Sequence, residues 1–130
     1  MKKKFSMLWK SSKQTRKQRK YRYNAPIHTK RKFINAHLSK ELRSKYNKRS
    51  IGLKRGDKVK IMRGQFKGKT GKVERIDIER LCAYITGIEV IKKDGTKTLF
   101  PLNPSNLLIS ELTIDDKKRQ QILDRKKSGK

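Results

Sequence analysis

The chain has 130 residues, of which 38 are Lys or Arg and 11 are Asp or Glu, and its net charge at pH 7 is +27. A chain of this length forms one small domain, and a charge this high makes the protein repel itself unless a polyanion neutralises it. The sequence contains neither an amphipathic basic helix, nor a lipid-anchor motif, nor a run of about 18 apolar residues, which excludes membrane insertion and favours nucleic acid as the polyanion.

The basic first half of the chain is predicted to be an RNA-binding extension. Residues 1–50 hold 18 of the Lys and Arg residues and a single acid, Glu41. Their like charges repel and their apolar residues are sparse, so this half should not fold alone. We expect residues 10–32 to be an arm that is extended or irregular without its partner. The extreme N-terminus, which is charged but lacks the apolar core of a signal peptide, predicts that the protein stays in the cytoplasm where it is made.

One short helix is predicted within this extension, over residues 39–46. Ser39 is a suitable N-cap, and Glu41 would lie in the first turn, where the helix dipole favours an acid. Apolar side chains spaced by four residues would line one face of the helix, namely Leu38, Leu42 and Tyr46. We expect that face to dock on the middle of the chain.

The middle of the chain, residues 51–112, has the pattern of a small β domain. Short runs rich in apolar and β-branched residues occur at 57–62, 73–78, 81–85, 88–92, 96–100 and 107–109, and those at 57–62 and 81–85 have the alternation of a strand. The run at 73–78 skips a step, which indicates a bulge. Lys93-Asp94-Gly95 is typical of a hairpin turn. About five short strands with no helix between them predict a small closed barrel.

The last segment, residues 113–130, is predicted to be a C-terminal helix followed by a basic tail. Thr113 can cap the helix, with Asp115 and Asp116 in its first turn and Gly129 at its end. A thin apolar stripe would consist of Ile114, Ile122 and Leu123.

The residue types that support catalysis or metal binding are scarce. Cys82 is the only cysteine, so no internal disulfide can form, and we expect it to be a small apolar filler in a strand. His28 and His37 show no zinc-type spacing. The acids are scattered, and the glycine-rich loop lacks the Walker pattern of nucleotide-binding loops. We therefore predict no enzymatic activity, no catalytic residue, no metal, no cofactor and no small-molecule substrate.

The most informative segment is GDKVKIMRGQFKGKTGKV at residues 56–73. It resembles the KOW motif, which occurs in SH3-like barrels of ribosomal proteins and of transcription elongation factors. The expected fold is therefore mainly β, a five-stranded SH3-like barrel carrying the basic extension and the C-terminal helix. Glycines allow a tight turn and a close approach to phosphates. Phe66 could stack on a base or ribose; alternatively it folds onto the barrel.

A longer resemblance covers residues 13–127. In order, the chain contains YNAPIH at 23–28, RK at 31–32, LSKELRSKY at 38–46, the KOW segment, NPSNL at 103–107 and DKKRQQILDRK at 116–126. This set resembles the L-twenty-four family of large-subunit ribosomal proteins, of the archaeal and eukaryotic kind. One departure is Asn103, where family members often carry histidine. The first ten residues match no pattern that we can place.

The resemblance implies a structural protein of the large ribosomal subunit. Family members bind the large ribosomal RNA near its 5′ region, act early in subunit assembly and lie near the exit of the nascent-chain tunnel. The implied partners are large-subunit rRNA, neighbouring large-subunit ribosomal proteins and factors that dock at the tunnel exit. Two alternatives stay open: a KOW-type transcription elongation factor, which would need a further folded domain before the barrel, and a histone-like DNA packer.

The residues expected to contact RNA fall into three groups. In the first half, bases are interleaved with tyrosines that can stack on unpaired bases, and the residues are Lys13, Arg16, Lys17, Arg19, Lys20, Tyr21, Arg22, Tyr23, His28, Lys30, Arg31, Lys32, Lys48 and Arg49. The KOW segment contributes Arg63, Gly64, Phe66, Lys67, Gly68, Lys69 and Lys72. The resemblance adds Asn103, Ser105 and Asn106.

Overall fold

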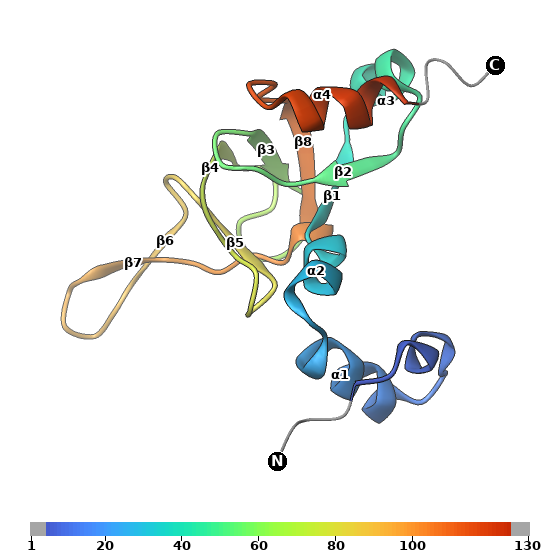
Figure 1. Ribbon diagram of the computed structural model, residues 1–130. Coiled ribbons are helices and arrows are strands. Elements are labelled where there is room, and N and C mark those ends of the chain that lie inside the picture. The colour runs from blue at the N-terminus through green and yellow to red at the C-terminus, as the bar shows by residue number, and fades with distance from the viewer. Residues whose placement is uncertain (1–4, 126–130) are drawn as a thin grey trace.

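A computed structural model describes residues 5–125 of the chain and shows a mainly β protein with helices at both ends (Figure 1). The strands in this part are β1 (Asn35–Leu38), β2 (Ser50–Gly52), β3 (Lys58–Ile61), β4 (Thr70–Asp77), β5 (Cys82–Ile85), β6 (Glu89–Ile91), β7 (Lys97–Leu99) and β8 (Leu107–Glu111). The α-helices are α1 (Thr15–Asn24), α2 (Ile27–Lys30), α3 (Lys40–Tyr46) and α4 (Lys117–Asp124), and the short 3-10 helices are η1 (Met7–Ser11), η2 (Arg31–Phe33) and η3 (Pro104–Asn106).

Six of these strands form one sheet in the order β2-β1-β8-β3-β4-β5, and β6 and β7 form a separate hairpin. The pairing of β1 with β8 is parallel, and the other neighbours are antiparallel. Strands β2 and β5 stay at the edges of this order, so the strand ladders among residues 5–125 form no closed ring. The eight strands exceed the expected five: β1 lies in the basic half of the chain, β2 begins at its end, and the other six lie between residues 58 and 111.

Several local predictions in the middle of the chain are confirmed. Strand β3 alternates exposed lysines with buried apolar residues, and the register of β4 against β5 shifts between Val73 and Arg75, where the bulge was expected. The β6–β7 hairpin turns at Gly95, which has a φ of +81°. Hydrogen bonds from Thr96 hold the pKa of Asp94 in this turn below its ordinary value. Cys82 is buried in β5, as predicted.

Helix α3 is also confirmed, with Ser39 as its N-cap. The Ser39 hydroxyl oxygen accepts a hydrogen bond from the Leu42 backbone N–H. The expectation for Leu38 was wrong, because this residue lies in β1 and is fully buried there. The β1 segment was missed since Asn35 and His37 are weak strand formers, although Ala36 and Leu38 between them alternate as a half-buried strand requires.

The arm is helical in this structure, which corrects the expectation that residues 10–32 are irregular. Helix α1 contains Arg, Lys and Gln, which favour helix. Tyr21 from this helix packs against Phe5 and Phe33, with ring centroids 5.2 Å and 5.9 Å away. Figure 1 shows α1 beyond the end of the sheet, joined to it through α2. The arm thus has a small aromatic cluster of its own.

The C-terminal helix α4 begins later than predicted. Asp116 is its N-cap and accepts a hydrogen bond from the Lys118 N–H, so Thr113 is not the cap and Asp115 and Asp116 do not form the first turn. Leu123 is buried, whereas Ile114 and Ile122 are exposed. Gly129 and the basic tail of residues 126–130 lie outside the described residues. Within the described part, no helix is both long and apolar enough to span a membrane.

A buried ion pair attaches α4 to the sheet. The Arg119 guanidinium donates from Nη1 to Asp57 Oδ1 and from Nη2 to Asp57 Oδ2, both at 2.6 Å, and the two side chains are 3% and 0% exposed. Arg119 also donates to the Thr113 carbonyl, and Asp57 accepts hydrogen bonds from the backbone N–H groups of Lys54 and Thr113. The pair therefore joins α4 to the start of β3, and its further hydrogen bonds fix Lys54 before β3 and Thr113 before α4.

The packing around Gly71 gives a prediction about stability. A Cβ at Gly71 would lie 2.6 Å from Ile85 Cγ2 and 2.7 Å from the Thr86 carbonyl oxygen. Gly71→Ala should therefore destabilise the protein by about 1–3 kcal/mol, because β4 and β5 would have to separate. Gly52→Ala in β2 is the matched control, since its nearest atom would be 3.5 Å away. Urea unfolding measures both, and an equal loss in the two variants would contradict the close approach seen here.

Candidate nucleic-acid interface

The loop between β3 and β4 holds most of the cations predicted in the KOW segment. Two hydrogen bonds at Ile61 close it: the Gly68 N–H donates to the Ile61 carbonyl, and the Ile61 N–H donates to the Lys69 carbonyl, both at 2.9 Å. Gly64 and Gly68 have φ values of +91° and +89°, which favour glycine over other residues. The cations on and beside this turn are all exposed to solvent: Arg63, Lys67, Lys69 and Lys72.

Phe66, at the tip of this turn, is half-buried. Its ring lies 5.2 Å from the ring of Phe100, and the Lys69 ammonium lies 5.2 Å from its centroid. The ring therefore packs against the core on one side, as in the alternative interpretation of this residue. Part of it remains accessible beside a cation.

A hollow of about 350 Å³ lies next to Phe66 and joins two segments far apart in the sequence. Its walls include Arg63, Gly64, Gln65 and Phe66 from the KOW loop, together with Phe100, Pro101, Leu102, Asn103 and Asn106. The Met62 N–H donates to the Asn106 carbonyl at 2.8 Å and holds the segments together. The fold thus brings Asn103 and Asn106 next to Arg63 and Phe66 of the KOW loop.

Ser105 faces a second hollow, of about 340 Å³, that shares Arg63 with the first. Asn103 Oδ1 accepts hydrogen bonds from the Ser105 backbone N–H and hydroxyl group, at 3.1 Å and 2.9 Å, so this amide oxygen is engaged locally. His37 and Arg43 also line the second hollow, and neither was among the predicted site residues. The β1 strand places His37 there, so recognising β1 in the sequence would have revealed it.

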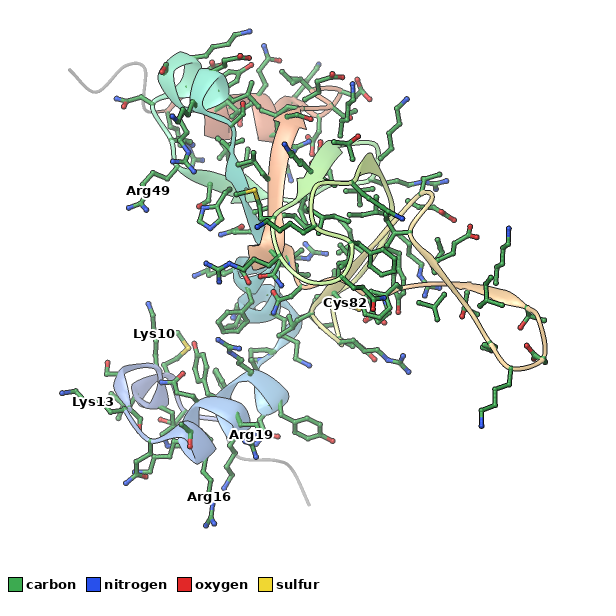
Figure 2. All side chains as sticks on the ribbon, turned by 180° about the vertical axis from the view of Figure 1, so that it is seen from behind. Lys10, Lys13, Arg16, Arg19, Arg49 and Cys82 are labelled. Atoms are coloured by element: carbon green, nitrogen blue, oxygen red, sulfur yellow. The ribbon has the colours of Figure 1, made fainter. Side chains whose placement is uncertain are left out.

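The arm presents a second cationic surface. Figure 2 shows the side chains of Lys10, Lys13, Arg16 and Arg19 pointing outward from it. Lys10 was not among the predicted residues. The remaining predicted arm residues that are exposed are Lys17, Lys20, Arg22, Tyr23, His28, Arg31 and Lys32, and Arg49 is exposed after α3. No acid occurs in the described arm before Glu41, so this surface has one sign of charge.

Three predicted residues in the first half of the chain are not exposed and make contacts within the protein. Tyr21 is only 3% exposed because its ring fills the aromatic cluster of the arm, so it does not offer a face for stacking. Lys30 is half-buried, and its ammonium donates to the Glu79 carbonyl at 3.4 Å. Lys48 donates to the Ile122 carbonyl of α4. These contacts hold the arm and α4 in place.

The acids and histidines form no comparable site. Among residues 5–125, no three His, Cys, Asp or Glu side chains are grouped in a way that could hold a metal ion. What the described surface offers chemically is cations, amides and a half-exposed ring around turns with accessible backbone. Such groups bind phosphates and bases.

Comparisons with known proteins agree with this surface chemistry. A family model that describes the eukaryotic L26 and archaeal L24 ribosomal proteins matches residues 12–126. The chain is 46% identical over 114 residues to "Large ribosomal subunit protein uL24" of Methanothrix thermoacetophila, a match that covers 88% of this chain and 98% of the relative. It is 44% identical over 115 residues to the protein of the same name from Methanosphaera stadtmanae, with the same coverage. The chain therefore belongs to the family of ribosomal proteins that this model describes.

Proposed function

We propose that this protein is a structural component of the large ribosomal subunit and binds large-subunit rRNA in the cytoplasm. The family match supports the ribosomal role, and both relatives are named as large-subunit proteins. The main support for rRNA binding is the hollow where the KOW loop meets Asn103 and Asn106, on a chain of net charge +27. Phosphate neutralisation by such a surface supplies affinity, and the polar groups around the hollow supply specificity.

The two cationic surfaces have different roles in this proposal. The KOW loop and the neighbouring polar segment grip a folded RNA site through Arg63, Gly64, Phe66, Lys67, Gly68, Lys69, Lys72, Asn103, Ser105 and Asn106. The exposed arm residues neutralise phosphates of adjacent RNA helices, with Tyr23 as the ring that faces solvent. The protein acts by binding and catalyses no reaction.

The sheet that carries the KOW loop is proposed to be an SH3-like barrel. The ladders run from β8 through β3 and β4 to β5, and Ala83 of β5 forms an isolated bridge with Leu102. Its two hydrogen bonds, at 2.8 Å and 2.9 Å, bring the segment before β8 back onto β5. This return supports barrel-like closure without a continuous ladder.

The finer parts of the proposal rest on the family resemblance. The protein would bind the 5′ region of the large rRNA, assist early subunit assembly and lie near the exit of the nascent-chain tunnel. Neighbouring ribosomal proteins and factors that dock at the exit would be its protein partners. A surface that contacts RNA over both the arm and the barrel fits early assembly, because it can hold RNA helices together.

A charge-matched pair of variants tests the KOW site. Replacing Arg63, Lys67, Lys69 and Lys72 by Ala removes four exposed cations from a turn, so folding should survive. Binding to an rRNA fragment should weaken by at least about tenfold more than in a control lacking Arg80, Lys92, Lys93 and Lys97, because phosphate contacts depend on position as well as on total charge. The control residues are also exposed. Filter binding measures both, and equal losses would mean that the KOW loop is only a structural turn.

A further inference from the structure

A groove separate from the KOW loop lies between the arm, β2, the end of β4 and α4. Its volume is about 610 Å³, and segments distant in sequence line it. Figure 1 shows α4 lying over the end of the sheet near β2. Of the residues that line it, only Arg31 belongs to the proposed RNA-binding surface.

The floor of this groove, which we call the α4 groove, is aliphatic. Ile34, Ile51 and Leu53 are core residues at its base, and Ile76 and Ile78 are half-buried beside them. Ile122 closes the groove from α4 and is 43% exposed. A neighbouring hollow of about 400 Å³, which we call the Ile27 hollow, shares Ile76 and Ile78 with the groove and adds Ile27, which is 58% exposed. A continuous aliphatic strip of this kind is typical of a surface that another molecule covers.

The rim of the α4 groove is cationic. Arg31, Arg55 and Lys118 line it and are exposed. The acids nearby are engaged: Asp116 pairs with Lys54 and caps α4, and Asp57 is buried against Arg119. The charge of the Ile27 hollow differs from that of the groove, since Asp77 and Glu79 balance Arg75 there. A ligand of the α4 groove must therefore combine apolar groups with negative charge.

RNA does not fit this requirement. No aromatic side chain lines the α4 groove, so no ring is offered to a base, and an isoleucine floor gives nothing to phosphates. The ends of this chain do not fit either, because residues 1–4 and 126–130 contribute six lysines and no acid. A second copy carries the same charge of +27 and would be repelled.

We propose that the α4 groove binds an acidic, amphipathic segment of another protein, with aliphatic anchors on the floor and Asp or Glu side chains against Arg55 and Lys118. This inference goes beyond rRNA binding and does not depend on it. The anchors bury the strip formed by Ile76, Ile78 and Ile122, and the acids pair with the rim. Such pairing steers association, while the buried aliphatic area supplies most of the affinity.

A synthetic peptide of Glu with Leu at every third or fourth position is the probe for this groove, and the same peptide with Ser in place of Leu is its control. The full-length protein should bind the Leu peptide at least about tenfold more tightly, as burial of aliphatic side chains predicts. Ile122→Glu should abolish the difference, whereas Ile91→Glu on the β6–β7 hairpin, equal in charge and also exposed, should preserve it. Fluorescence anisotropy at near-physiological salt measures both peptides, and equal binding of the two by the unaltered protein would overturn the proposal.

Two further measurements test the same groove. If Ile122→Glu unfolds α4, seen by circular dichroism, Lys118→Glu replaces it and should weaken binding of the Leu peptide several-fold. A photocrosslinker at position 122 of the full chain in isolated large subunits should join it to another protein. Crosslinks to RNA alone, or none to another protein, would overturn the proposal. The peptide measurement uses no RNA, so its failure is distinct from failure of the proposed rRNA binding.

Discussion

Arg119→Met should destabilise the protein by about 3–5 kcal/mol, since it removes one partner of a buried ion pair. Arg119 and Asp57 are 3% and 0% exposed and share two hydrogen bonds of 2.6 Å. Met keeps the apolar length of the side chain, so the loss reflects mainly the Asp57 carboxylate left buried without its cation. Urea unfolding followed by circular dichroism measures the free energy of unfolding.

Lys58→Met is the matched control for this ion pair. Lys58 pairs with Glu111 at 2.7 Å, but the two side chains are 45% and 68% exposed. Because water screens this pair, its loss should cost less than about 1 kcal/mol. If Arg119→Met cost no more than Lys58→Met, α4 would not be held to the sheet by the Asp57–Arg119 pair.

Deleting residues 1–32 should leave the fold intact and lower RNA affinity by at least about a hundredfold. The deletion removes 13 Lys and Arg residues and no acid. The main core cluster has no member before Ile34, so its packing is untouched. The slope of log K against log salt should flatten by roughly 0.7–0.9 for each phosphate contact that is lost.

The truncated protein should retain β-type circular dichroism and melt cooperatively, because the core sets its stability. The deletion does remove Tyr21, the ring partner of Phe33, and the Lys30–Glu79 hydrogen bond, so a small decrease in stability is expected. Complete unfolding would instead mean that the arm is part of the core. The division between an RNA-binding arm and a folded body would then be wrong.

Prediction from sequence succeeded where the signal is local. The alternation in β3, the bulge in β4, the Lys93-Asp94-Gly95 turn and the Ser39 cap each depend on a few adjacent residues. Strands β1 and β2 were missed because they are short and contain or follow polar and cationic residues in the sequence. What stabilises β1 is its parallel pairing with β8, a contact about 70 residues away that no local pattern reveals.

The candidate site shows the same division. Exposure of the KOW cations followed from the turn pattern, whereas burial of Tyr21 depends on Phe5 and Phe33 folding around it. His37 and Arg43 were missed since they come from β1 and α3, and only the packing of these two elements places them beside Arg63. In the sequence, nothing distinguishes Arg119 from the other basic residues near the C-terminus. Its role follows only from the fold, which places it against Asp57.

Equilibrium binding of the full-length protein to large-subunit rRNA over a range of salt concentrations measures how far its cationic surfaces recognise that RNA. We predict a slope of log K against log salt of about −4 or steeper, equivalent to at least about six phosphate contacts, and a preference for the rRNA over duplex DNA in competition. A slope near zero, or equal competition by duplex DNA, would contradict the claim that this family member recognises ribosomal RNA through its cationic surfaces.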